Sequence, residues 1–184
     1  MKKYTKYFIL LVLFFSIGAF AQNKIDSVIK LDPEGFREVL VKANGLYISG
    51  QPEKKGLDML KTLGVTTVVN LRTEGEMNNR EIVPFDEAAY IDSLGIKYVH
   101  IPLGGKENPY TPEALTKFNK AVEQANGKLL LHCTVAWRAS HLWTAYLVKY
   151  KGLDVDKAIE FGKQINLGTL PLEKFLNKKI SLKN

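Results

Sequence analysis

Cysteine is almost absent from this sequence, with Cys133 as its single example. One cysteine excludes a disulfide within the chain and a zinc site built on paired cysteines. Histidine is also scarce, with three residues. Neither His100 nor His141 has a partner histidine at the spacing of metal ligands, so we assign chemistry to neither.

The sequence also lacks internal repeats, low-complexity stretches and a linker that would separate two halves. Its 184 residues predict one globular domain with an appendage. With 46% hydrophobic and 24% charged residues, the composition is that of an ordinary folded protein. Disordered, collagen-like and coiled-coil chains are excluded on that basis, and residues 22–184 are interpreted as a single domain.

Positive charge is only mildly in excess over negative charge. The 26 basic and 19 acidic residues give a formal charge of +7, which in general favours anionic partners. Three of the lysines, Lys2, Lys3 and Lys6, lie in a leader, and without them 23 basic residues face 19 acidic ones, a charge of +4. Because the remaining excess is scattered, we expect no nucleic-acid partner.

Long hydrophobic runs are missing apart from one near the start, from Phe8 to Phe20, which follows a lysine-rich segment. The run ends in Ala19-Phe20-Ala21, a typical cleavage site, so residues 1–21 are predicted to be a secretory signal peptide. The alternative is a membrane anchor, but a spanning helix needs about 20 apolar residues. We therefore expect export, to the periplasm or beyond the cell, and no stable membrane insertion after cleavage.

Predicted strands and helices alternate along the rest of the chain. Apolar and β-branched runs predict strands, whereas apolar stripes at helical spacing, bounded by proline and glycine, predict helices. The predicted strands are Leu46–Ser49, Val65–Leu71, Tyr98–Pro102 and Leu129–His132, and the predicted helices are 52–63, 84–94, 111–127, 138–150, 154–164 and 171–178. This order predicts an α/β fold with a mainly parallel central sheet flanked by helices.

The most informative segment runs from the strand Leu129–His132 into the following helix. The strand delivers Cys133 to the carboxyl end of the sheet, where ligands bind in such folds, and Arg138 opens the helix after a four-residue loop. The loop N–H groups and the helix N-terminus form an oxyanion cradle, which favours the thiolate of Cys133. Arg138 can grip two oxygens of a phosphate or sulfate. A buried structural cysteine and a solvated arginine are the alternative interpretation, because short motifs often occur by chance.

Four segments in order carry a family resemblance: Tyr47–Pro52, Gly64–Arg72, Gly95–Pro102 and His132–Arg138. From Leu46 to about Tyr150 the chain resembles small bacterial phosphatases related to dual-specificity and tyrosine phosphatases. It is most similar to the DUF442 branch, a domain of unknown function that is fused to some β-lactamase-like hydrolases. The resemblance implies the cysteine-phosphatase fold, a phosphocysteine intermediate and a phosphorylated substrate, either a small molecule or a protein. It also implies that neither a metal nor a cofactor is needed.

By motif position, Cys133 resembles the nucleophile, Arg138 the residue that grips the phosphate, and His132 the residue that orients the loop and favours the thiolate. The loop residues Thr134, Val135, Ala136 and Trp137 would bind the substrate together with Arg138. Four residues separate the cysteine from the arginine, whereas most cysteine phosphatases have five. Four is the spacing of this bacterial branch and also of rhodanese sulfurtransferases.

Three further positions depart from the family pattern. Ala136 stands where the branch usually has glycine, and if that residue adopts a positive φ, alanine costs on the order of 1 kcal/mol. Trp137 takes a position usually held by a small polar residue. Ala139 replaces a hydroxyl residue that assists the leaving cysteine in many relatives, and Ser140 is the nearest substitute.

The sequence does not clearly assign the general acid, the residue that would protonate the departing oxygen. Related enzymes carry an aspartate on the loop that corresponds to Leu103–Pro109, and this loop has none. Glu107 is the nearest candidate, with a solvated loop glutamate as the alternative. Lys106 would add positive charge at the mouth of the site. Arg72, at the same sheet edge, is expected to pair with an acid such as Glu76.

Together these observations predict an exported cysteine-dependent phosphatase. A rhodanese-like sulfurtransferase is one alternative, favoured by the loop length. A domain that binds a phosphorylated or sulfated ligand without turnover is the other, favoured by Ala136, Trp137 and the missing aspartate.

Overall fold

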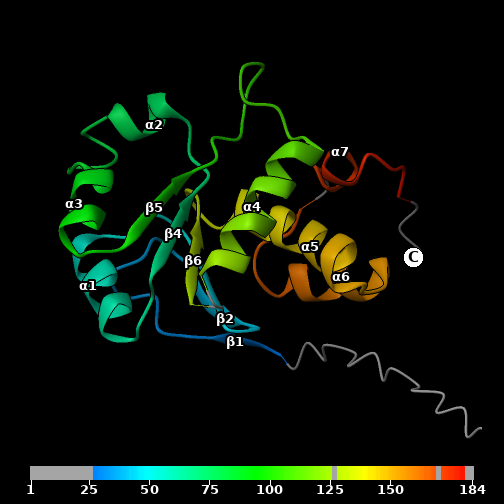
Figure 1. Cartoon of the computed structure of the whole chain (residues 1–184), viewed down its shortest axis with the longest axis horizontal. Helices are drawn as coiled ribbons and strands as arrows, with labels where there is room; N and C mark the ends of the chain where they lie inside the picture. Colours follow the sequence, from blue (N-terminus) through cyan, green and yellow to red (C-terminus); the bar gives the residue numbers. More distant parts are fainter. Residues whose placement is uncertain (1–26, 126–127, 169–170, 181–184) are drawn as a thin grey trace, which may run out of the picture.

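The structure, a computed structural model, describes residues 27–125, 128–168 and 171–180. The predicted signal peptide lies outside these residues. Within them, a six-stranded sheet has helices on both sides (Figure 1). The strands are β1 Val28–Lys30, β2 Leu40–Ala43, β3 Leu46–Ser49, β4 Thr67–Asn70, β5 Lys97–His100 and β6 Leu129–His132. The helices are α1 Lys54–Thr62, α2 Glu74–Asn78, α3 Glu87–Ser93, α4 Pro112–Gln124, α5 Trp137–Lys151, α6 Val155–Lys163 and α7 Leu172–Leu176.

The strand order is β1-β2-β3-β6-β4-β5. Strands β3, β6, β4 and β5 pair in parallel, whereas β1 and β2 extend one edge in antiparallel fashion. The α/β fold with a mainly parallel sheet is therefore confirmed. Strand β6 lies between β3 and β4, and its last residue, His132, is in register with Ser49 and Asn70. Three strands thus end at the same level, directly before the predicted reactive loop.

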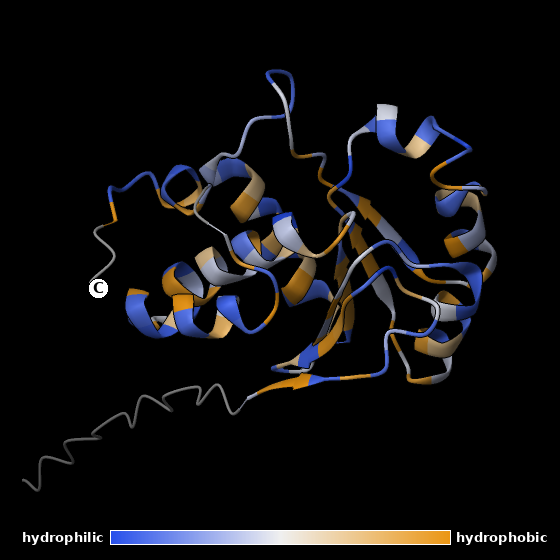
Figure 2. Ribbon diagram, turned by 180° about the vertical axis from the view of Figure 1, so that it is seen from behind, coloured by the Kyte–Doolittle hydropathy of each residue, from blue (hydrophilic) through white to orange (hydrophobic). Residues whose placement is uncertain are grey.

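Alternating side chains of the strands supply two separate cores. Leu129 and Leu131 face the helices α4 to α7, whereas Leu130 faces α1 and α3. Successive residues of a strand point to opposite faces, and a parallel sheet is normally covered on both. Figure 2 shows the consequence, with mostly hydrophobic central strands and helices in which hydrophilic and hydrophobic residues alternate.

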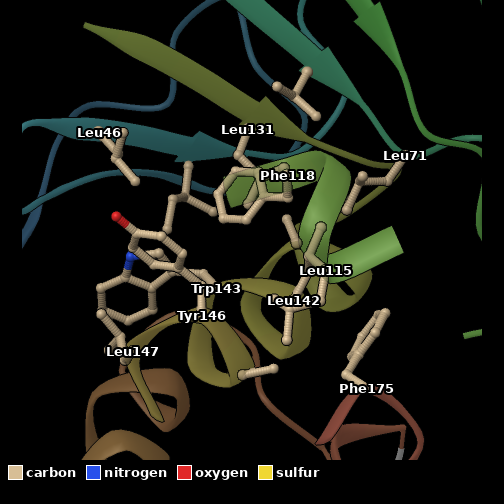
Figure 3. Close-up of a cluster of buried hydrophobic side chains, with 14 of the residues drawn as sticks. Leu46, Leu71, Leu115, Phe118, Leu131, Leu142, Trp143, Tyr146, Leu147 and Phe175 are labelled. Atoms are coloured by element: carbon tan, nitrogen blue, oxygen red, sulfur yellow. The ribbon is translucent and has the colours of Figure 1, made fainter. Parts of the chain in front are cut away.

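Helix α5 is the most deeply buried helix among the described residues, because every residue from Ala139 to Leu147 is buried. Its Leu142 and Trp143 pack among the side chains shown in Figure 3, which include Phe118 of α4 and Phe175 of α7. The helix lies within one residue of its predicted bounds. The loop that precedes it is consequently anchored on both sides, by the central strand and by a helix fixed in the core.

Several predicted boundaries were wrong, and three elements were not predicted: β1, β2 and α2. Pro52 does not open α1, because it forms an isolated bridge with Phe36 and Glu53 is the N-cap. Helix α3 begins three residues later than predicted, where the Asp86 side chain accepts the N–H of Ala89. Among the helices of the described residues, none is long and apolar enough to cross a membrane.

Candidate active site

The loop between β6 and α5 turns its carbonyl groups outward. The carbonyl of Thr134 accepts the N–H of Gln51 at 3.0 Å, and the carbonyl of Val135 accepts Nδ2 of Asn166 at 2.6 Å. No acceptor in the described part of the chain bonds to the backbone N–H groups of residues 134–138. These five successive N–H groups at the N-terminus of α5 are the donors from which the sequence predicts an anion cradle. Cys133, at the start of this loop, is 1% exposed.

Gly50 allows the chain after β3 to approach this loop closely. A Cβ atom at Gly50 would clash with the carbonyl oxygen of Arg37 and would lie 3.0 Å from that of Thr134. Gly50 also forms an isolated bridge with Val135. The end of the family-like segment Tyr47–Pro52 therefore packs against the outside of the loop.

Ala136 has a left-handed backbone, with φ 61° and ψ 3°, and is fully buried at the N-cap of α5. This is the conformation that favours glycine, so alanine stores strain of about 1 kcal/mol in the loop. The next residue, Trp137, packs its ring 4.4 Å from that of His141 and 6.5 Å from that of Tyr110. The rings of Trp137, His141 and Tyr110 thus lie side by side next to the loop.

The guanidinium group of Arg138 is held by a carboxylate. Nη1 donates to Oε2 of Glu76 and Nη2 to Oε1, both at 2.7 Å. Nη1 also donates to the carbonyl of Leu103 at 2.8 Å, and Nη2 to the hydroxyl of Thr134 at 2.8 Å. Sequence reasoning predicts that this fork grips an oxyanion, and in the structure the carboxylate of Glu76, with a similar pair of oxygens, accepts from it.

Glu76 is fixed by its own helix. Its side chain accepts the N–H of Thr73 while the Thr73 hydroxyl accepts the N–H of Glu76, a capping box at the start of α2. Burial alone would raise the pKa of Glu76, but hydrogen bonds from Arg138 and Thr73 outweigh it and hold the pKa well below its usual range. Arg72 Nε lies 3.4 Å from the same carboxylate, so the predicted pairing of Arg72 with Glu76 is confirmed.

His132 lies behind the loop and is fully buried. Its Nε2 atom is 3.1 Å from Oε1 of Glu87, the first residue of α3. Sequence reasoning did not identify Glu87 at all. It considered Glu76 as a partner of Arg72 and as a helix cap or surface acid, but not as a partner of Arg138. The Thr73-x-x-Glu76 capping-box pattern is readable in the sequence and would have placed Glu76 at this sheet edge.

The hydroxyl of Ser140 forms a hydrogen bond within its own helix, donating to the carbonyl of Trp137 at 2.8 Å. It is therefore not free to replace the hydroxyl that Ala139 lacks.

Glu107 lies in an exposed turn closed by the hydrogen bond from Gly104 N–H to the carbonyl of Asn108. It lines a hollow of about 570 Å³ together with Lys106 and Gly104. A Cβ atom at Gly104 would lie 3.7 Å from Nη1 of Arg138. The structure thus brings Glu107 and Lys106 to a hollow beside Arg138 and leaves both side chains exposed.

The remaining histidines bond to backbone groups. Nε2 of His100 lies 2.7 Å from the carbonyl of Arg72, and the His141 ring nitrogens lie near the carbonyls of Trp137 and Gly168. Burial lowers the pKa of His141, although both carbonyls act in the opposite direction. Within residues 27–125, 128–168 and 171–180, no group of three or more His, Cys, Asp or Glu side chains could hold a metal ion.

Comparison with known proteins identifies the family. Residues 46–182 match the catalytic domain of the dual specificity phosphatases. The chain belongs to this family. It is 29% identical over 145 residues to the human dual specificity protein phosphatase 26, a match that covers 75% of this chain and 64% of that enzyme. The chain thus spans less than two thirds of the length of this relative.

Bacterial relatives point to the branch identified from the sequence motifs. The chain is 30% identical over 98 residues to a β-lactamase hydrolase-like protein of Xylella fastidiosa, covering 53% of this chain and 22% of that protein. A DUF442 structure from Shewanella putrefaciens CN-32 is 27% identical with a TM-score of 0.58, and the match covers 78% of this chain and 90% of the other. The resemblance to this cysteine-phosphatase-like branch is confirmed.

Proposed function

We propose that this member of the phosphatase family hydrolyses a phosphate monoester through a phosphocysteine intermediate on Cys133. The observation that carries the proposal is the loop Cys133–Arg138, in which five backbone N–H groups face no acceptor of the described chain and the cysteine opens the cradle. The substrate class is a phosphorylated small molecule or protein, and no metal, cofactor or nucleic acid is required.

The chemistry follows from this arrangement in two steps. The Cys133 thiolate attacks phosphorus, the sulfur–phosphorus bond forms, and the bond to the ester oxygen breaks. Glu107 is proposed to give that oxygen a proton, since an alkoxide is otherwise a poor leaving group. Water then attacks the phosphocysteine, releasing inorganic phosphate and restoring the thiolate. His132 orients the strand end from which the cysteine projects.

Arg138 is proposed to exchange a partner during this cycle. Both of its terminal nitrogens donate to Glu76, whereas its Nε–H has no hydrogen bond within the described residues. A phosphoryl group in the cradle competes for these donors, because two non-bridging oxygens present the same geometry as a carboxylate. Thr134 and Leu103, which also bind the guanidinium, keep it at the loop while the exchange takes place.

The test compares an aryl phosphate and thiosulfate as substrates of residues 22–184. The proposal expects hydrolysis of the phosphate ester, no turnover of thiosulfate, and no activity in Cys133→Ser. Arg138→Lys keeps the charge but loses the planar fork, so both phosphate binding and turnover should weaken. Turnover of thiosulfate alone would identify a sulfurtransferase and overturn the proposal.

A second candidate is a domain that binds an oxyanion without turning it over. The strained Ala136 and the engagement of Arg138 by Glu76 favour this function. It predicts that phosphate protects the protein against unfolding while neither substrate is consumed.

Export belongs to the same proposal, and it rests on the leader sequence alone. Protein recovered from the native host should begin at Gln22, as mass spectrometry of the intact chain would show. A chain that retains Met1 and stays with the membrane would contradict it.

A further inference from the structure

A carboxylate is buried behind the reactive loop. Glu87 is 2% exposed and lies at the carboxyl edge of the sheet. Three side chains from separate strands or strand ends converge on it: Nε2 of Gln51 at 2.5 Å, Nδ2 of Asn70 at 2.8 Å and Nε2 of His132 at 3.1 Å. Burying a carboxylate is unfavourable unless donors and charges surround it, so this convergence has to be maintained by the fold.

The surroundings keep Glu87 ionised. Burial alone would raise its pKa, but the electrostatic interaction with the neighbouring His132 ring and the hydrogen bonds from Gln51 and Asn70 outweigh burial, and the pKa lies below its usual range. Arg72 adds a further positive charge on this side. The pKa of Tyr98 is raised, first by burial and then by the negative charge of Glu87, with a smaller contribution from the charge of Asp86. The Tyr98 hydroxyl accepts a hydrogen bond from Asn70, which acts in the opposite direction.

The His132 ring depends on this carboxylate for its orientation. The ring is completely buried, and neither ring nitrogen makes a hydrogen bond of good geometry among the described residues, although Nε2 lies 3.1 Å from Oε1 of Glu87. Glu87 is the one side chain there that lies within ion-pair distance of the ring. A carboxylate facing Nε2 fixes a proton on that nitrogen, because the alternative tautomer would place two lone pairs against each other.

We propose that Glu87 is a positioning residue for Cys133: it holds the proton on Nε2 of His132 and so sets the pH at which the adjacent cysteine becomes a thiolate. The contact runs from α3 to the last residue of β6, directly before the reactive loop. The inference rests on the proposed function, since it assigns a role in preparing the same nucleophile.

Alkylation of the native protein by iodoacetamide tests this directly, because Cys133 is the only thiol in the chain. The alkylation rate is measured against pH for the wild type, Glu87→Gln and Glu87→Asp. Glu87→Gln removes the carboxylate that holds the Nε2 proton of His132, and through this loss the pH midpoint should move up by about one unit, which is about tenfold in rate at pH 6. A direct effect of the lost negative charge on the thiol would move the midpoint down instead. Glu87→Asp keeps the charge and should stay closer to the wild type.

A purely structural role predicts the opposite order, because glutamine matches glutamate in shape and aspartate leaves a gap. The matched control is Glu81→Gln, the same chemical change at an exposed position in the loop before α3, which should leave the midpoint unchanged. If Glu87→Gln does not fold, as judged by circular dichroism, His132→Gln takes its place and should raise the midpoint by a similar amount.

The outcomes separate this inference from the proposed function. A low midpoint in the wild type that Glu87→Gln leaves unchanged, or that Glu87→Asp disturbs more than Glu87→Gln, overturns the role of Glu87 alone. A wild-type thiol that reacts like a free one and is not protected by phosphate contradicts the proposed function itself.

Discussion

Glu76 and Arg138 form a two-point pair in which Nη1 of the arginine donates to Oε2 of the carboxylate and Nη2 donates to Oε1, each at 2.7 Å. The pair joins α2 to the first turn of α5, at the end of the loop that begins with Cys133. Glu76 therefore orients the arginine and also occupies the donors that a phosphoryl group would use. Both roles can be measured in one variant.

Glu76→Gln should lower the free energy of unfolding by about 2 kcal/mol, the order typical of hydrogen bonds to charged groups. Inorganic phosphate should stabilise this variant more than the wild type, because Arg138 then has no competing carboxylate. Thermal unfolding with and without phosphate measures both effects. Equal stabilisation of the two proteins would show that Glu76 does not compete with the ligand.

The stability of the wild type should fall in acid. The folded-state pKa of Glu76 lies below its usual value of about 4.3, so its contribution is fully present above about pH 4.3. That contribution is lost as the pH falls through the folded-state pKa. The difference in unfolding free energy between wild type and Glu76→Gln should consequently shrink from about pH 6 to about pH 3, as urea titrations would show. A constant difference would contradict the account.

Ala136→Gly should leave stability nearly unchanged, since relief of strain offsets the greater freedom of glycine in the unfolded chain. The matched control is Ala139→Gly, also fully buried but inside α5, which should cost about 1 kcal/mol. Urea unfolding compares the two. Equal losses would mean that the left-handed backbone of residue 136 carries no strain.

Glu107→Gln should reduce turnover of an alkyl phosphate by about 100- to 10,000-fold and that of an activated aryl phosphate only slightly, because only the alkoxide needs a proton to leave. Glu113→Gln, at an exposed position in the first turn of α4, is the control and should affect neither substrate. Small and equal effects in Glu107→Gln would place the general acid elsewhere.

The sequence was sufficient for those parts of the fold that follow from local patterns. Strands Leu46–Ser49 and Leu129–His132 were predicted with their observed bounds because both are short, apolar runs that the sheet buries. The bounds of α3 were less accurate, because the cap at Asp86 determines its start. Strand β1 is an edge strand with exposed or half-buried side chains, and β2 is a short strand whose apolar run is interrupted by the exposed Lys42; neither was predicted.

Within the site, the sequence placed Cys133, His132 and Arg138 because these residues are consecutive parts of one strand, loop and helix. The conditional expectation for Ala136 is also confirmed, since its φ is positive. The acids were the difficult part. Glu87 is 45 residues from His132 and Glu76 is 62 residues from Arg138, so only the three-dimensional arrangement brings each pair together.

Trapping the intermediate tests the central claim most directly. Wild-type protein quenched in acid during turnover of an aryl phosphate should carry one phosphoryl group, located by mass spectrometry on the peptide that contains Cys133, and Cys133→Ser should carry none. Turnover that proceeds with no phosphoryl group on Cys133, or with the group on another residue, would contradict the mechanism.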